Sequence, residues 1–406
     1  MLQAWFGNPR DELLSGIRRR RALVIDLWGD ELPGYRRFTT KGLTAFRGTP
    51  WVWSIIQNFG GNSAITGNLE VIASQYGAGG AFEDPRRGRL EGLGLTMEAI
   101  EHNPVVLDLL AEMIWRQPDE GPLDLDAWVQ DYADRRYGRR LAAPREAWLK
   151  LLRTGYSTTP TLAAAQSILC ARPGLDVVSA AVSSQGAGDP RYDTNLFEQA
   201  VADLLAARTE LRGVDTYEYD LVDVTRQVLA NRARPLLHEI RDAFEHGDAS
   251  RFDCTSRRFL ALIADQDRLV ATRPEFLLGR WIQRARGWGT TPAEQDALER
   301  DARTILTTWT EGDSLLHDYA HREWAGLLGS LYYTRWQRYF DYLAGQLAGA
   351  AGAPPSFFAI ESAWVNDTDP SGTTFSAVPA GSSTDVGAEL FAKYTAAAPV
   401  CPPSAP

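Results

Sequence analysis

A carboxylate that directly follows an apolar run is the residue of this sequence best suited to covalent chemistry. Glu98 comes after the run GLGLTM at residues 92–97, which is typical of a buried strand. In barrels of alternating strands and helices, catalytic side chains lie at the carboxyl ends of the strands, and a carboxylate can act there as a glycosidase nucleophile. The same glutamate could instead begin the next helix and complement its dipole. Position alone leaves both roles open.

Other polar side chains follow two earlier apolar runs. Asp30 and Glu31 come after the run that ends at Trp28, and their position favours structural hydrogen bonding over contact with a sugar hydroxyl. Asn58 and Asn62 surround a glycine pair after the next run, where amides could hold sugar hydroxyls and the glycines would let backbone approach a ligand. Turn formation explains both asparagines equally well.

Metal, phosphate and serine-hydrolase chemistry have little support. His317 and His321 have the spacing that places two imidazoles on one helix face, but no glutamate follows His317 and no third ligand is obvious. The glycines at 77, 79 and 80 form neither a dinucleotide fingerprint nor a phosphate loop. No nucleophile elbow is present. The three cysteines have no metal-type spacing and predict neither a zinc site nor a disulfide framework: Cys170, Cys254 and Cys401.

Composition narrows the class of partner. The chain has 406 residues, 44% hydrophobic and 23% charged, which predicts a globular protein of two or three structural units. A net charge of -10 argues against nucleic acid or an anionic membrane as the main partner. No apolar stretch approaches about 18 residues, so no membrane span is expected. Only three of the 42 basic side chains are lysines, which indicates a GC-rich, bacterial genome rather than a function.

The pattern of hydrophobic residues along the sequence changes after Glu98. Before it, four apolar runs alternate with helix-like segments, as in half of a (β/α)₈ barrel: residues 2–6, 22–28, 51–57 and 90–97. After it, helical periodicity dominates: residues 105–116, 125–137, 143–154, 195–208, 217–244, 250–271, 274–286, 292–308 and 314–347. One more ordered piece at 357–365 and one helix at 385–394 are expected after these. We therefore expect an α/β unit followed by an all-α unit: a half barrel at 1–118, a helical domain at 119–395 and a flexible tail at 396–406.

At this point the sequence resembles glycoside hydrolase family 89, the α-N-acetylglucosaminidases. The matching blocks run in the family's order over most of the chain, and the ordered set is specific although each block alone is weak. They are VIDLW at 24–28, WVWSIIQNFGGN at 51–62, residues 92–103, RRYG at 135–138, YDLVDVTRQ at 219–227, FLLGRW at 276–281, LTTW at 306–309, DYA at 318–320 and YYTRW at 332–336.

The resemblance implies a retaining mechanism that needs neither a metal nor an organic cofactor, acting on glycans with terminal N-acetylglucosamine. It implies that Glu98 is the nucleophile and that Trp5 is a pocket aromatic. It also implies that Trp309, Leu316 and Tyr319 close the sugar pocket from the helical domain, with Leu316 in a segment one residue longer than the family's usual spacing.

The family's acid/base glutamate follows an asparagine on a strand upstream of the one that resembles residues 2–6. We therefore expect that this glutamate, the small N-terminal domain and the first half of the barrel are missing here, and that the chain alone is inactive. We expect the full-length protein to be secreted or otherwise exported. The rival interpretation is a non-catalytic carbohydrate-binding or interaction protein built on a degenerate barrel. The sequence does not give the oligomeric state.

Overall fold

The structure is a computed structural model, and it describes residues 1–18, 21–57, 60, 62–98, 102–116, 120–157, 167–176, 190–369, 371, 374–396 and 401. The chain forms two compact units. The first contains Met1–Gly61 and Ile65–Ala164, and the second contains Asn62–Ala64 and Ala165–Pro406. A short piece of the loop near residue 60 thus belongs to the second unit.

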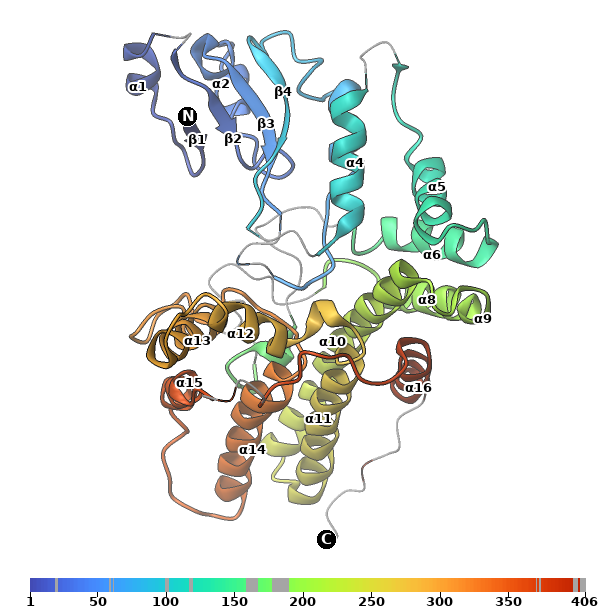
Figure 1. The fold of residues 1–406 in the computed structure, drawn as a ribbon, viewed down its shortest axis with the longest axis vertical. Coiled ribbons are helices and arrows are strands. Elements are labelled where there is room, and N and C mark those ends of the chain that lie inside the picture. The colour runs from blue at the N-terminus through green and yellow to red at the C-terminus, as the bar shows by residue number, and fades with distance from the viewer. Residues whose placement is uncertain are drawn as a thin grey trace. The chain divides into compact units, whose positions relative to one another are not determined.

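The first unit is built on a parallel sheet whose four strands lie side by side in chain order (Figure 1). The strands are β1 (Leu2–Ala4), β2 (Val24–Asp26), β3 (Trp51–Ile55) and β4 (Leu90–Leu95). Val24 is in register with Leu2 on one side and with Trp51 on the other. The predicted strands and their parallel arrangement are therefore confirmed, because short β-branched and aromatic runs separated by crossovers favour this topology.

The fourth strand differs from expectation in its burial. The residues of β3 are mostly buried, whereas those of β4 are half-buried or exposed. Among the described residues β4 pairs with β3 alone. Its run of apolar residues and glycines predicted a fully buried strand, but an edge strand has a neighbour on one side only.

Six helices accompany the sheet in the described part of the first unit: α1 (Asp11–Gly16), α2 (Arg36–Thr39), α3 (Leu69–Ala73), α4 (Pro104–Trp115), α5 (Leu125–Tyr137) and α6 (Ala142–Leu152). Helix α4 packs against β4 and α3. Helix α5 has the predicted bounds, because Asp124 caps its first turn and Gly138, at φ 67°, ends it in the left-handed conformation.

The first compact unit extends beyond the expected division at residue 118. Helices α5 and α6 pack on each other, and the chain after α6 returns to α3. There the backbone N–H of Leu69 donates to the carbonyl of Tyr156, and Asn68 and Ser157 form a bridge. These contacts connect the chain as far as Ser157 with α3, while the domain limits 1–118, 119–395 and 396–406 stay a prediction.

The second unit is helical in its described part (Figure 1). Its long helices α10 (Asp215–Glu245) and α11 (Ala249–Val270) pack along each other, and α14 (Tyr333–Leu347) packs on α11. The remaining helices are α8 (Thr194–Ala206), α9 (Arg208–Leu211), α12 (Leu278–Arg286), α13 (Pro292–Leu306), α15 (Phe357–Asn366) and α16 (Ser383–Thr395). Polar caps start several of them, such as Thr291, which forms a capping box with Glu294.

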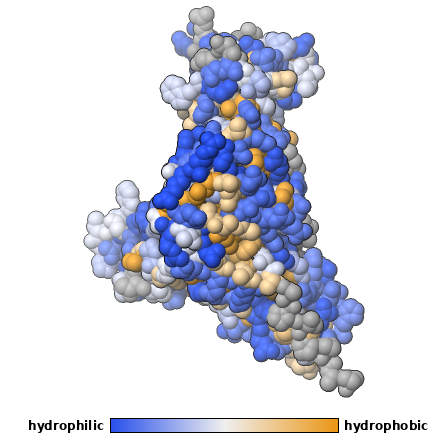
Figure 2. Space-filling model, turned by 90° about the vertical axis from the view of Figure 1, so that its right-hand side faces the viewer, coloured by the Kyte–Doolittle hydropathy of each residue, from blue (hydrophilic) through white to orange (hydrophobic). Residues whose placement is uncertain are grey.

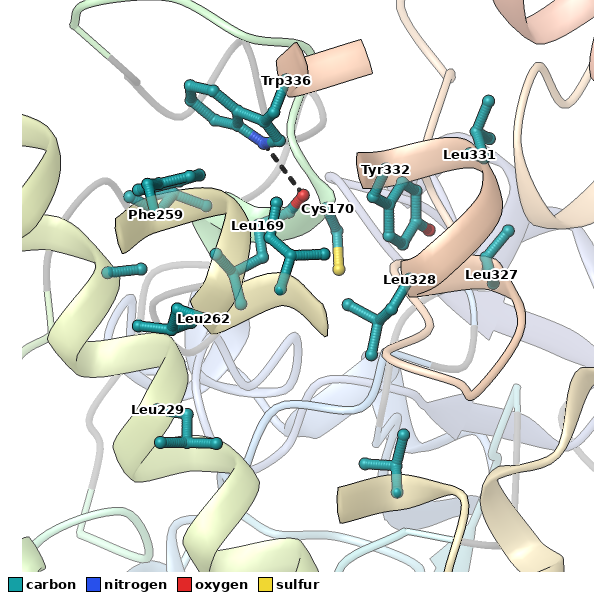
Figure 3. Close-up of a cluster of buried hydrophobic side chains, with 14 of the residues drawn as sticks. Leu169, Cys170, Leu229, Phe259, Leu262, Leu327, Leu328, Leu331, Tyr332 and Trp336 are labelled. Atoms are coloured by element: carbon teal, nitrogen blue, oxygen red, sulfur yellow. Dashed lines mark hydrogen bonds between the residues drawn. The ribbon is translucent and has the colours of Figure 1, made fainter. Parts of the chain in front are cut away.

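A continuous apolar core lies between these helices. Figure 3 shows Phe259 and Leu262 of α11 facing Leu328, Tyr332 and Trp336, with Leu169 and Cys170 between them. The indole N–H of Trp336 donates to the carbonyl of Leu169 at 3.1 Å, which ties the short turn Ile168–Cys170 to α14. The core therefore depends on a segment far upstream in the sequence.

The single helix expected over residues 314–347 is wrong in its first half. The α-helix begins only at Tyr333, after a π-helical turn over Leu328–Tyr332. Asp318, His321 and Gly326 have positive φ values of 56°, 44° and 91°, which no α-helix allows. Ala325 pairs instead with Leu277 in an extended bridge. The same bridge divides the helix expected over residues 274–286.

A disulfide joins Cys254 of α11 to Cys401. The two positions are 147 residues apart in the chain and their Cα atoms are 5.8 Å apart. The prediction that the cysteines form no disulfide framework is therefore wrong for this pair, since only the fold brings them together. Cys170 is a free, buried thiol.

The molecular surface reflects the charged composition. Figure 2 shows a largely hydrophilic face with a smaller group of apolar side chains near its middle. Within the described residues, no helix combines the length and apolar character that crossing a membrane requires.

Candidate functional site

Glu98 lies just beyond the carboxyl end of the sheet. Pairing with β3 continues past β4, because the N–H of Thr96 donates to the carbonyl of Ile55 at 2.9 Å. The hydroxyls of Thr96 and Ser54 are also within hydrogen-bond distance, at 3.0 Å. Glu98, two residues further on, is exposed, and its carboxylate accepts a hydrogen bond from the backbone N–H of Gly60. The sheet thus presents this carboxylate to solvent at the edge where barrel chemistry occurs.

Two glycines allow the strand ends to approach closely. A Cβ atom on Gly94 would lie 2.8 Å from Cγ1 of Val52, and one on Gly29 would lie 2.5 Å from the indole of Trp53. Contacts below 3.0 Å would force the strands apart. Close packing next to β3 therefore requires a glycine at position 94, whereas a Cβ on Gly92 would meet nothing within 4 Å.

Asp30 carries a buried carboxylate oxygen in the turn that follows β2. Its Oδ1 has no hydrogen-bond partner, while its carbonyl accepts from the side-chain amide of Asn68 at 3.0 Å. Burial, with the neighbouring charge of Glu31, raises the pKa of Asp30 to about 8. A carboxyl group with this pKa is protonated at neutral pH and can act as a hydrogen-bond donor.

Asp26 is a second buried acid, which the sequence reasoning missed. Its carboxylate accepts from the backbone N–H groups of Gly34 and Tyr35 at 2.8 and 2.9 Å. Burial raises its pKa to about 6, against the lowering effect of these two hydrogen bonds. Asp26 therefore fixes the loop after β2, and its place inside an apolar run was the signal that could have identified it.

Trp5 follows β1 and lines a cavity of about 400 Å³. Its ring stacks on that of Trp28, with centroids 4.8 Å apart and planes 19° from parallel. Arg36 and Arg37 line the same cavity, and Glu98 does not. The structure thus places Trp5 in a cavity lined by aromatic rings and two arginines. Its contact with substrate stays a prediction.

The two asparagines near the glycine pair have different outcomes. Asn58 lies outside the described residues. Asn62 is buried, and its Oδ1 accepts from the N–H of Ala64 at 2.7 Å, which is the hydrogen bond of an Asx turn. The side-chain oxygen therefore holds the local turn, and the sugar-binding role of both residues stays a prediction.

Ser63, which the sequence reasoning did not consider, connects the segment Asn62–Ala64 to other residues of the second unit. Its N–H donates to the carbonyl of His321 at 3.3 Å, and its hydroxyl accepts from the N–H of Glu323 at 3.2 Å. Its carbonyl accepts from the guanidinium of Arg226, which also pairs with Asp223 and Glu323. Nothing in the sequence around Ser63 signals these contacts, which exist only in the folded chain.

The three expected pocket residues of the helical unit lie in one short non-helical segment. The rings of Trp309 and Tyr319 meet edge to face, with centroids 4.9 Å apart and planes at 79°. The N–H of Tyr319 donates to the carbonyl of Leu316 at 3.1 Å. Trp309 and Tyr319 are half-buried and Leu316 is 36% exposed, so all three reach the surface. We call residues 309–319 the aromatic corner.

Tyr319 was expected in the first turns of a helix, which is wrong. The corner is a series of turns, in which Trp309 has a φ of 63° and Asp318 a φ of 56°. The N–H of Asp318 donates to the carbonyl of Thr307 at 2.6 Å and closes the corner at its base. Such positive φ values in non-glycine residues are strained and are found where the surroundings impose them.

The histidine pair is occupied by structural contacts. Nδ1 of His317 lies 3.0 Å from a carboxylate oxygen of Asp318, and Nε2 of His321 lies 2.9 Å from the carbonyl oxygen of Ser167. In the part of the chain that the structure describes, no group of three or more His, Cys, Asp or Glu side chains could hold a metal ion.

Comparison with family models gives two matches that together span nearly the whole chain. The model described as "Alpha-N-acetylglucosaminidase (NAGLU) tim-barrel domain" matches residues 1–117. The model described as "Alpha-N-acetylglucosaminidase (NAGLU) C-terminal domain" matches residues 128–393.

Individual relatives agree with these matches. The chain is 31% identical to human alpha-N-acetylglucosaminidase over 413 residues, which cover 97% of this chain and 52% of that protein. A family 89 glycoside hydrolase from Clostridium perfringens, solved in complex with PUGNAc, superposes with a TM-score of 0.89 at 30% identity. This match covers 97% of this chain and 44% of that one. The chain thus spans about half the length of these relatives.

A further solved structure contains the substrate of the relative. It is the Clostridium perfringens protein with two Glu→Gln substitutions, in complex with its substrate GlcNAc-alpha-1,4-galactose. The TM-score is 0.88 at 30% identity, again over 97% of this chain and 44% of that one.

Proposed function

Because the chain belongs to the α-N-acetylglucosaminidase family, glycoside hydrolase family 89, we propose that it carries the nucleophile of a retaining hydrolase that removes terminal α-linked N-acetylglucosamine from glycans. The observation that carries the proposal is the position of Glu98, exposed at the carboxyl end of a parallel sheet with the Gly60 N–H on its carboxylate. The four strands would form half of the catalytic (β/α)₈ barrel.

The proposed reaction has two displacement steps. An oxygen of Glu98 attacks the anomeric carbon and forms an ester bond as the glycosidic C–O bond breaks. A second carboxylic acid gives its proton to the leaving oxygen. The same group then takes a proton from water, whose oxygen attacks the anomeric carbon and releases Glu98 as a carboxylate. Two inversions retain the configuration, and neither step needs a metal or an organic cofactor.

We propose that the second carboxylic acid comes from a glutamate outside these 406 residues, as the family resemblance implies. The 406-residue chain produced alone should then form no measurable product from an aryl α-N-acetylglucosaminide, whereas the full-length gene product should. Normal turnover by the 406-residue chain would show that its own residues supply both carboxyl groups.

The proposed substrate-binding residues are those expected from the sequence. Trp5 would offer an apolar ring and Asn58 and Asn62 polar groups. The aromatic corner would close the pocket with Trp309, Leu316 and the hydroxyl of Tyr319. Aromatic rings pack well on the apolar faces of sugars, and half-exposed rings such as those of Trp309 and Tyr319 are available for this.

A panel of aryl glycosides tests the function. The full-length gene product should hydrolyse the α-N-acetylglucosaminide in preference to the β-anomer, the α-glucoside and the α-N-acetylgalactosaminide. Proton NMR during the reaction should detect the α-anomer of the free sugar first. Initial release of the β-anomer would exclude the double displacement, and binding without turnover of any glycoside would favour the non-catalytic carbohydrate-binding alternative.

We also propose that the full-length protein is exported. The support is the Cys254–Cys401 disulfide, because such bonds persist in oxidising compartments and are rare in a reducing cytosol. Fractionation of the source cells checks this, and recovery of the active protein only from the cytosol, with both thiols free, would contradict it.

A further inference from the structure

Two aspartates of the aromatic corner are held by one connected set of charged side chains, which is fully buried at Asp318 and partly exposed at Asp313. Nη2 of Arg172 lies 2.8 Å from the carboxylate of Asp313. At the other end, Nη1 of Arg335 donates to both carboxylate oxygens of Asp318, at 3.1 and 2.9 Å. Ion pairs therefore hold the corner on both sides of Leu316, and Tyr319 directly follows Asp318.

Glu361 of α15 connects the two arginines. Its carboxylate accepts from Nε and Nη2 of Arg172 at 3.0 and 2.6 Å, and from Nη1 of Arg335 at 2.7 Å. Arg335 also donates to the carbonyl of Cys170. We call Arg172, Glu361 and Arg335 the arginine clamp. Its members come from three distant parts of the sequence, so the corner is fixed only when the whole helical unit has folded.

Burial makes the clamp sensitive to the loss of any one partner. The side chains of Arg335, Glu361 and Asp318 are fully buried. Although burial acts to raise it, the Arg335 guanidinium and the His317 hydrogen bond hold the pKa of Asp318 below its ordinary value. A buried ion pair contributes little net stability when intact, but removing one partner leaves an uncompensated charge. The clamp therefore fixes the position of the aromatic corner more than it adds to the stability of the fold.

We propose that the arginine clamp positions the aromatic corner for sugar binding and thereby sets the affinity for the N-acetylglucosamine ring. The inference rests on the function proposed above, since it assumes that Trp309, Leu316 and Tyr319 contact the sugar. The clamp residues are positioning residues that act through the corner. Their loss should weaken binding in the ground state and the transition state alike, which raises KM and leaves kcat nearly unchanged.

The central test is Glu361→Gln in the full-length gene product. The amide has the shape of the carboxylate but turns N–H donors toward one arginine, so the corner should loosen and KM for an aryl α-N-acetylglucosaminide should rise about tenfold, with kcat within about twofold of wild type. Arg172→Met is a second variant. It removes the ion pair with Asp313 and leaves the one with Asp318 in place, and Arg172 is less buried than Glu361. It should also raise KM, but by a smaller factor than Glu361→Gln.

The matched control is Glu299→Gln in α13. Glu299 is also a fully buried glutamate between two arginines, with Oε2 2.7 Å from Nη1 of Arg286 and Oε1 2.9 Å from Nε of Arg303. It should lower the thermal midpoint about as much as Glu361→Gln, while KM stays at the wild-type value. Equal rises of KM in both glutamate variants, or an unchanged KM in Glu361→Gln and Arg172→Met, would overturn the proposal.

Hydrogen exchange separates this inference from the proposed function. Amides of residues 309–319 should exchange faster in Glu361→Gln than in Glu299→Gln, whether or not the protein turns over a glycoside. Faster exchange at the corner in Glu361→Gln, together with a wild-type protein that hydrolyses no glycoside, would mean that the clamp is correct and the proposed function is wrong. Unchanged exchange at the corner in Glu361→Gln would contradict the clamp itself.

Discussion

The carboxylate of Glu98 accepts a hydrogen bond from the backbone N–H of Gly60. The first residue follows β4 and the second follows the neighbouring strand β3, so parallel pairing brings the ends of both strands to one edge. The Gly60 N–H orients one oxygen of this exposed carboxylate at the end of the strand. The relationship thus gives a structural reason to assign the nucleophile here and not to Asp30, whose Oδ1 is buried.

Trp309→Ala should impair binding more than folding. Trp309 is half-buried and packs on Tyr319, so its loss should lower kcat/KM by about 2 kcal/mol while the thermal midpoint changes little. Both quantities are measured on the same preparation of full-length protein.

Trp336→Ala is the control for this experiment. Trp336 is fully buried in the helical core, so truncation there should cost about 3–5 kcal/mol of stability. If Trp309→Ala lost stability on that scale and kept its kcat/KM, Trp309 would be a core residue and would leave the proposed pocket.

Asp30→Asn should remove part of the pH dependence of stability. The folded-state pKa of Asp30 is about 8, raised by burial, and the unfolded value is near 3.9. The native state therefore holds the proton more tightly, so the free energy of unfolding falls as pH rises from about 4 to 8. The loss is on the order of a few kcal/mol.

Urea unfolding of both proteins at pH 5 and pH 8 measures this difference. The free energy of unfolding of the variant should increase relative to that of the wild type as pH rises, because an amide does not ionise. Profiles that stay parallel from pH 5 to pH 8 would show that Asp30 titrates normally in the folded protein.

Reduction of the Cys254–Cys401 bond should destabilise the helical unit. The bond closes a segment of 147 residues, and disulfides of this kind typically contribute about 2–4 kcal/mol by restricting the unfolded chain. Thermal unfolding with and without a reductant reports the loss. The double variant Cys254→Ser, Cys401→Ser should have the lower thermal midpoint even without a reductant, and a reductant should not change it further. A reductant effect that survives in this variant would point to Cys170 or to another cause.

The sequence predicted regular elements well and connections poorly. Alternation of apolar runs and crossovers located all four strands, and the helix predicted over residues 125–137 has these bounds in α5. The segment from Ser314 to Leu327 has a helix-like composition, but its left-handed residues and the bridge between Leu277 and Ala325 depend on distant contacts. No local pattern carries that information.

The buried charges show a further limit of sequence reasoning. The excess of arginine over lysine was attributed to the genome, yet Arg226 and Arg335 are fully buried and hold distant segments together. Arginine suits such sites because its planar group donates in several directions at once. Only the partners identify these residues, and some partners are distant in sequence. Ser63 and Arg226 are 163 positions apart, and Cys170 and Arg335 are 165 positions apart.

The central claim is that Glu98 is the nucleophile, and Glu98→Ala in the full-length gene product tests it most directly. Turnover of an aryl α-N-acetylglucosaminide should fall by orders of magnitude, because no covalent intermediate can form. Sodium azide should restore part of the rate by attacking the anomeric carbon in place of the carboxylate and yielding the β-glycosyl azide. Retention of more than about a tenth of the wild-type rate, without azide, would contradict the assignment.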